Sequence, residues 1–114
     1  IKIRKGNDDT LGYRDMIFVH KQAVDYCEQN SFYDKTIAAH FLTYKNITDK
    51  NLGYLTGDKA FEKVSTSIDS TTDLVIISSV DHDKIWYEKI KEYNGTLIKR
   101  FERKNCWTEI QKLK

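Results

Sequence analysis

The sequence predicts one α/β domain spanning residues 1–114: a Rossmann-like sandwich with a mostly parallel central sheet and a C-terminal antiparallel hairpin. The predicted element order is β-α-β-β-β-α-β-β. Three observations predict this fold. Apolar residues recur at helical spacing over residues 13–27, residues 74–77 are all aliphatic, and residues 96–113 alternate on both sides of a short turn. These patterns are typical of an amphipathic helix, a strand buried on both faces and a hairpin.

The N-terminal segment is predicted to form a strand, an acidic turn and a helix. Residues 1–5 alternate between apolar and basic side chains, and Gly6-Asn-Asp-Asp-Thr10 follows as the turn. Asp9 or Thr10 is expected to cap a helix that ends at Asn30-Ser31. The buried stripe of this helix is predicted from its i, i+3, i+4 spacing. It comprises Tyr13, Met16, Ile17, His20, Ala23, Val24 and Cys27.

The middle of the chain is predicted to supply three strands. Residues 35–43 carry apolar groups on both faces, which indicates a strand inside a covered sheet. Residues 46–60 are less regular: Leu52, Tyr54 and Leu55 can form a short helical turn, and residues 61–65 a brief strand. Residues 73–79 are the clearest buried strand.

A second helix is predicted to begin at Asp81, as its cap, and to run to Tyr93. Ile85, Trp86 and Ile90 are expected to face inward. Gly95 fits the left-handed position that often closes a helix.

The chain is predicted to close with a hairpin of residues 96–102 and 106–113. Lys104-Asn105 suits the tight turn between them, because asparagine tolerates a positive φ. Phe101 and Trp107 are expected to form a cross-strand pair.

Composition excludes several classes of function. A net charge of +2 gives no overall attraction to nucleic acid or anionic lipid. Residues 1–83 carry 10 basic and 13 acidic side chains, whereas residues 84–114 carry 9 and 4. The basic excess includes Lys99, Arg100, Arg103 and Lys104, which we interpret as a solvated sheet edge that resists aggregation. No nucleic-acid partner is predicted.

The two cysteines and the longest apolar run set further limits. Cys27 and Cys106 are too few for a disulfide framework or a metal knuckle, and we expect buried free thiols, with a single bridge as the open alternative. The run at residues 74–77 is far too short to span a bilayer, so this piece of chain is expected to be soluble.

Polar residues at predicted strand ends form the candidate ligand site. Asn7, Asp8 and Asp9 follow the first strand, and Asp81 and His82 follow the strand at 73–79. Ligands of open α/β sheets bind at such carboxyl ends, and oxygen ligands suit magnesium or calcium. The simpler interpretation, which we favour, is that these acids cap helices and stay hydrated. No cofactor is predicted.

The remaining chemistry-bearing residues fit no recognised motif. His20 and His40 are predicted as satisfied core histidines. Gly6 and Gly12 match neither the G-x-G-x-x-G spacing nor a phosphate-binding loop, and the two acids between them would repel a phosphate. No nucleophile–base arrangement is found, so no catalytic residue is assigned.

Several segments together resemble a known family. Four segments occur in order: Gly6-Asn-Asp-Asp-Thr-Leu-Gly-Tyr-Arg-Asp15, Ala23-Val-Asp-Tyr26, Gly53-Tyr-Leu55 and Leu74-Val-Ile-Ile-Ser78. The closing Lys99-Arg-Phe-Glu102 is followed by Trp107-Thr-Glu-Ile110. In this order they resemble the C-terminal extramembrane domain of bacterial GT-C type membrane glycosyltransferases. That group is similar to the dolichyl-phosphate-mannose-protein mannosyltransferases of family 39.

The resemblance implies a fragment of an enzyme that lacks the enzyme's active site. In that family a lipid-phosphate-linked sugar donor and the catalytic acid belong to the membrane-embedded part, which this chain does not match. The chain would be an extracytoplasmic lobe on the periplasmic side of the inner membrane, cut from a longer protein, as the initial Ile1 also suggests. Its partners would be the membrane-embedded part of the same polypeptide and a glycan or protein acceptor. The alternative is a small ligand- or divalent-metal-binding module of a soluble protein.

Overall fold

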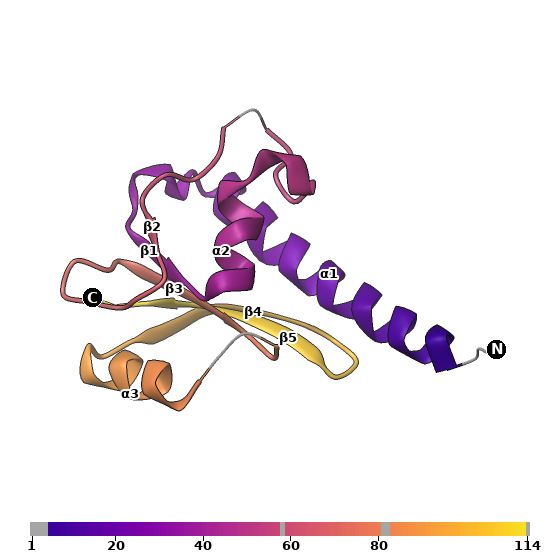
Figure 1. The fold of residues 1–114 in the computed structure, drawn as a ribbon. Coiled ribbons are helices and arrows are strands. Elements are labelled where there is room, and N and C mark those ends of the chain that lie inside the picture. Colours follow the sequence, from indigo (N-terminus) through magenta and orange to yellow (C-terminus); the bar gives the residue numbers. More distant parts are fainter. Residues whose placement is uncertain (1–4, 58, 81–82, 114) are drawn as a thin grey trace.

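The computed structural model of the chain describes residues 5–57, 59–80 and 83–113 and shows an α/β fold in three layers (Figure 1). The helices are α1 (Lys5–Gln29), α2 (Phe41–Thr48) and α3 (Lys84–Glu92), with two short 3-10 turns, η1 (Phe32–Asp34) and η2 (Lys50–Leu52). The strands are β1 (Ile37–Ala39), β2 (Val64–Ser65), β3 (Leu74–Ser78), β4 (Thr96–Arg103) and β5 (Cys106–Lys112).

The five described strands form one mixed sheet in the order β2-β1-β3-β5-β4. β1 runs parallel to β2 and β3, whereas β5 runs antiparallel to β3 and β4. The expectation of a mostly parallel sheet is therefore not confirmed. The closing hairpin does not simply add to the edge, because β5 inserts beside β3 and leaves β4 outermost.

The helices cover both faces of the sheet (Figure 1). On one face, α1 and α2 pack on a core of buried side chains: Ala23, Val24, Cys27, Ile37, Ala39, Ile47, Phe61, Leu74, Ile76 and Ile110. On the other face, α3 packs on a second core: Ala38, Ile68, Val75, Ile77, Trp86, Ile90 and Leu113. The alternation of β3 between the two cores explains why its sequence is apolar throughout, as a strand covered on both faces requires.

The N-terminal prediction is wrong where the structure describes it. Lys5 and the expected turn over residues 6–10 lie inside α1, and the rest of the predicted first strand, residues 1–4, lies outside the described residues. Acidic residues near the start of a helix interact favourably with its dipole, and each of the two glycines in α1 costs only about 1 kcal/mol. The buried stripe of α1 is confirmed at His20, Ala23, Val24 and Cys27, but Ile17 is exposed.

The predicted strand over residues 35–43 is too long. β1 ends at Ala39, His40 adopts an extended conformation before α2, and the chain becomes helical at residue 41. Thr43, Asn46 and Ile47 are buried. Their i, i+3, i+4 spacing is helical and competes successfully with the alternation that suggested a strand.

The second helix and its ends differ in detail from the prediction. Asp83 caps α3 by accepting a hydrogen bond from the Trp86 amide at 2.9 Å, and Asp81 lies outside the described residues. Trp86 and Ile90 are buried as expected, whereas Ile85 is 64% exposed, since a nine-residue helix buries a single stripe here. Asn94, with φ 57°, takes the left-handed position assigned to Gly95.

The predicted pairing of Phe101 with Trp107 is also wrong. The two-residue turn aligns Phe101 with Thr108 and Glu102 with Trp107. A shift of one residue moves a side chain to the other face of a sheet. Phe101 accordingly packs below α1, and Trp107 packs with the core below α3.

Candidate functional site

The structure does not place Asn7, Asp8 or Asp9 at the end of a strand. Asn7, Asp8 and Asp9 lie in the first turns of α1, which extends beyond the sheet at that end (Figure 1). Asp81 and His82 lie outside the described residues. In the described part of the chain, no three His, Cys, Asp or Glu side chains are arranged to hold a metal ion.

His40 and Asp83 lie near the carboxyl ends of the parallel strands β1 and β3, where α/β sheets commonly bind ligands. Their Nε2 and Oδ2 atoms are 3.1 Å apart, and the His40 ring stacks on Trp86 with centroids 4.0 Å apart. The pair links the start of α2 to the start of α3. His40 lies where a catalytic base would be expected, but its ring contacts Asp83 and Trp86 and thereby joins two helices.

His20 is held inside the protein. It is 2% exposed, and its Nδ1 lies 2.8 Å from Asn46 Oδ1, which joins α1 to α2. The prediction of a core histidine is confirmed, and its Nδ1 atom is hydrogen-bonded.

Cys27 is fully buried below α1 and does not form a disulfide. Burial, and secondarily the charge of Glu28, raises the pKa of the Cys27 thiol to about 12. Only a thiolate is a competent nucleophile, so this sulfur is chemically inert at neutral pH.

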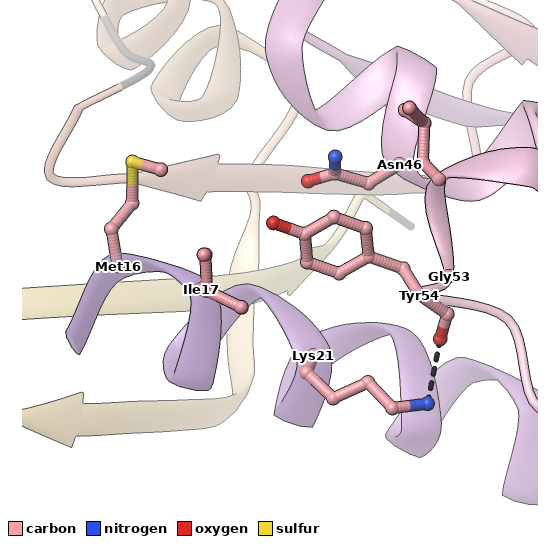
Figure 2. A pocket seen from close by; sticks show the side chains of 7 residues that line it. Met16, Ile17, Lys21, Asn46, Gly53 and Tyr54 are labelled. Atoms are coloured by element: carbon pink, nitrogen blue, oxygen red, sulfur yellow. Dashed lines mark hydrogen bonds between the residues drawn. The ribbon is translucent and has the colours of Figure 1, made fainter. Parts of the chain in front are cut away.

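One pocket lies between α1, α2 and the segment after η2 (Figure 2). Its volume is about 530 Å³, and its walls are mainly apolar. It is lined by Met16, Ile17, Lys21, Asn46, Leu52, Gly53 and Tyr54. Apolar walls with a few polar groups are typical of ligand pockets.

Backbone geometry shapes one side of this pocket. Gly53 ends η2 with φ 86°, a conformation that glycine adopts without steric cost. The chain then turns back so that the Tyr54 ring points toward Ile17 (Figure 2). The Tyr54 carbonyl accepts a hydrogen bond from Lys21 Nζ at 2.8 Å.

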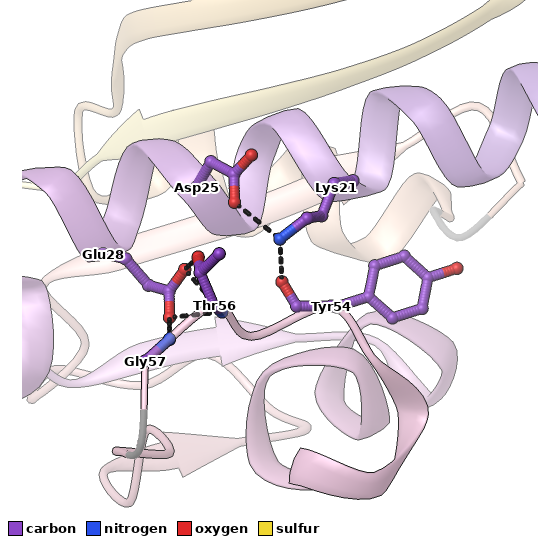
Figure 3. A network of polar contacts seen from close by, with 6 residues as sticks. All are labelled: Lys21, Asp25, Glu28, Tyr54, Thr56 and Gly57. Carbon is purple, nitrogen blue, oxygen red and sulfur yellow. Dashed lines mark hydrogen bonds and ion pairs between the residues drawn. The ribbon is translucent and has the colours of Figure 1, made fainter.

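A polar network fastens the segment after η2 to α1 (Figure 3). Lys21 also binds Asp25 at 2.9 Å. One turn further along α1, the Glu28 carboxylate accepts hydrogen bonds from Thr56 N at 3.0 Å, Thr56 Oγ1 at 2.5 Å and Gly57 N at 3.2 Å. The pocket wall is thereby held in place by two charged side chains of one helix.

The network lowers the pKa of Glu28. Partial burial acts to raise this pKa, but the hydrogen bonds from Thr56 and Gly57, together with the charge of Lys21, outweigh it. The carboxylate is therefore ionised at neutral pH and makes charge-assisted hydrogen bonds, which are stronger than neutral ones.

Sequence reasoning missed this pocket and its network. Glu28 and Thr56 are distant in sequence, and only the path of the chain through α2 and η2 brings them together. The sequence contains one local indication of the pocket. Gly53 and Gly57 flank Tyr54, and such a pattern is typical of a turn that exposes an aromatic side chain.

Comparison of the chain with protein-family models, with curated proteins and with solved structures finds no match. None of the described helices is long and apolar enough to cross a bilayer.

Proposed function

We propose that the chain is a noncatalytic, extracytoplasmic domain of a membrane-embedded glycosyltransferase that uses a lipid-phosphate-linked sugar donor. Its role is recognition of the acceptor, on the periplasmic side of the bacterial inner membrane. The family assignment rests on the resemblance of the ordered segments that begin at Gly6 and close at Ile110. The three-layer α/β fold is compatible with such a lobe.

One observation supports a noncatalytic role. The buried thiol and the two described histidines, the groups best suited to nucleophilic attack or proton transfer, each serve the fold. Cys27 is a protonated core residue, His20 bonds Asn46, and His40 lies between Asp83 and Trp86. What the described surface offers instead is a preformed apolar pocket, which suits binding.

The test compares the chain with its complete reading frame, expressed in a bacterial membrane. The full polypeptide is expected to transfer a labelled sugar from a polyprenyl-phosphate donor, whereas residues 1–114 alone transfer none. A phosphatase that is active only outside the cytoplasm, fused after Lys114, is expected to be active. A reading frame without hydrophobic spans, or sugar transfer by the isolated chain, would remove the proposal.

A second candidate function is a small-ligand-binding module of a soluble protein. The pocket of about 530 Å³ beside Tyr54 favours it, because that volume accommodates a small organic molecule. Thermal-shift screening with nucleotides, sugars and divalent ions separates the two candidates. A shift with magnesium or calcium alone would favour the metal-binding form of this alternative, which needs ligands outside the described residues.

A further inference from the structure

A second cleft, of about 430 Å³, separates α1 from the edge strand β4. Figure 1 shows these two elements passing beside each other on the face opposite α3. The cleft is lined by Gln22, Asp25, Tyr26, Gln29, Lys99 and Phe101. Unlike the pocket beside Tyr54, it is polar, and its volume is sufficient for a monosaccharide or a disaccharide.

The polar groups of this cleft include both donors and acceptors. Gln22 and Gln29 contribute amides that donate and accept, Asp25 accepts, and Lys99 donates. Asp25 engages Lys21 through one oxygen, and its carboxylate retains further lone pairs for a ligand. A sugar hydroxyl donates one hydrogen bond and accepts others, so this mixture matches a polyol.

One side chain that lines the cleft, Gln22, has an unsatisfied acceptor. Gln22 Oε1 is buried, and no hydrogen-bond partner is found for it among the residues that the structure describes. Buried polar atoms are nearly always bonded, and an exception calls for a physical explanation. The terminal torsion of glutamine is soft, so the amide can turn toward a ligand hydroxyl in the cleft.

Aromatic rings supply the apolar side of the cleft. Tyr26 and Phe101 meet edge to face with centroids 6.0 Å apart, and Lys99 Nζ lies 5.6 Å from the Phe101 centroid. The C–H face of a pyranose ring packs on such aromatic surfaces. Among the lining residues, Lys99 is positive and Asp25 is negative, and Asp25 is also paired with Lys21. The cleft therefore lacks the cluster of cations that a phosphate site uses.

From these features we infer that the cleft between α1 and β4 binds a neutral saccharide. The saccharide hydroxyls bond Gln22, Asp25 and Gln29, and a sugar face packs beside Phe101. This inference rests on the proposed function in one respect only: the bound saccharide would be the glycosyl acceptor of the transferase. The binding itself is a property of this chain.

The experiment titrates the ¹⁵N-labelled chain with a panel of neutral sugars and follows the backbone amide shifts. The panel contains methyl glycosides of glucose, galactose and mannose, with N-acetylglucosamine, maltose and cellobiose, each at tens of millimolar. At least one sugar is expected to shift the amides of residues 22–29 and 99–101. Gln22→Leu is expected to weaken that binding about tenfold, as the loss of one hydrogen bond predicts.

Two further variants make this test specific. Gln111→Leu is the matched control, because Gln111 lies on another strand, bonds Glu109 and is not among the residues that line the cleft. It is expected to bind sugar as the unmodified chain does. Gln29→Leu changes an exposed wall of the cleft and is also expected to weaken binding, which keeps the test informative if Gln22→Leu does not fold.

If Gln22 serves only the fold, Gln22→Leu lowers the thermal midpoint and leaves sugar binding unchanged. The saccharide site predicts a different result. Leucine has a helix propensity similar to that of glutamine and removes the unsatisfied oxygen, so Gln22→Leu is expected to keep or raise the thermal midpoint of the sugar-free chain. A lower midpoint with unchanged binding would overturn the inference.

The other outcomes separate this inference from the proposed function. No shift at the cleft with any sugar, or shifts confined to the pocket beside Tyr54, overturns the saccharide site even if the full polypeptide transfers sugar. Sugar binding that Gln22→Leu weakens, in a chain whose reading frame encodes no transferase, leaves the site standing and removes the proposed function.

Discussion

Replacing Glu28 by glutamine tests how firmly the segment after η2 is fastened to α1. The ionised carboxylate accepts hydrogen bonds from three donors, which are the two amides of Thr56 and Gly57 and the Thr56 hydroxyl. Glutamine keeps the shape of the side chain but replaces one acceptor oxygen with a donor. The variant therefore removes the charge and sets the new amide N–H groups against existing donors.

The magnitude follows from the difference between charged and neutral hydrogen bonds. A hydrogen bond to a charged group contributes about 1.5–3 kcal/mol and a neutral one about 0.5–1.5 kcal/mol. The contacts to Thr56 and Gly57 are exposed to solvent, which screens the charge and reduces the difference. Glu28→Gln is expected to lower the free energy of unfolding by about 1–2 kcal/mol and the Tm by about 5–10 °C.

The dependence on pH gives the sign of the electrostatic contribution. The pKa of Glu28 in the folded chain lies below its ordinary value of 4.5. The ionised form therefore stabilises the fold at pH values above 4.5, and this contribution is lost as the pH falls through the folded-state pKa. The difference between the unmodified chain and Glu28→Gln is expected to be full at pH 7 and to vanish in acid.

Urea unfolding followed by circular dichroism at several pH values measures this difference. Glu88→Gln is the matched control, because Glu88 is an exposed glutamate on α3, and it is expected to change stability by less than about 0.5 kcal/mol. Equal stability of Glu28→Gln and the unmodified chain at pH 7 would refute the reasoning. A loss that persists undiminished in acid would show that shape, and not charge, is responsible.

Three further predictions concern the interior. The Cys27 thiol is expected to resist alkylation in the native chain at pH 8 and to react only on unfolding, because a pKa of about 12 leaves about one thiol in 10⁴ as thiolate. Rapid alkylation of Cys27 in the native chain, detected by mass spectrometry, would contradict this. Gly95→Ala is expected to lower the free energy of unfolding by about 1–3 kcal/mol, because a Cβ at this position overlaps the Ile90 side chain. An unchanged Tm would show that the end of α3 can shift to make room for the added methyl group. Asn46→Ala is expected to lower the free energy of unfolding by about 1–3 kcal/mol, because the hydrogen bond to His20 is lost. If the NMR signal of His20 Nδ1 has the same chemical shift in this variant as in the unmodified chain, the contact does not exist.

The elements with strong local patterns could be predicted from the sequence. The aliphatic run of β3, the buried stripe of α1 at Ala23 to Cys27 and the closing hairpin are all found, because burial imposes the matching period on each of them. The strand–helix boundary at His40 was missed, since a short apolar segment fits both periods. Pairing across the hairpin was missed by one residue, and that shift places Phe101 and Trp107 on opposite faces of the sheet.

The clefts were less predictable than the fold. Each is formed by side chains from elements distant in sequence, as when Gln22 meets Lys99 across α1 and β4. No local pattern encodes that meeting, because it depends on the insertion of β5 beside β3, which leaves β4 at the sheet edge. The expected position of residues 7–9 after a strand was wrong for a related reason. It depended on a strand directly before them, whereas α1 begins at Lys5 and includes these residues.

We propose that this domain recognises the acceptor and performs no chemistry. The most direct measurement is the steady-state kinetics of the full polypeptide in membranes, unmodified and with Gln22→Leu, using a saccharide acceptor that binds the isolated chain. With Gln22→Leu, we expect a KM for the acceptor about tenfold higher and an unchanged kcat. A kcat reduced by orders of magnitude at an unchanged KM would contradict it.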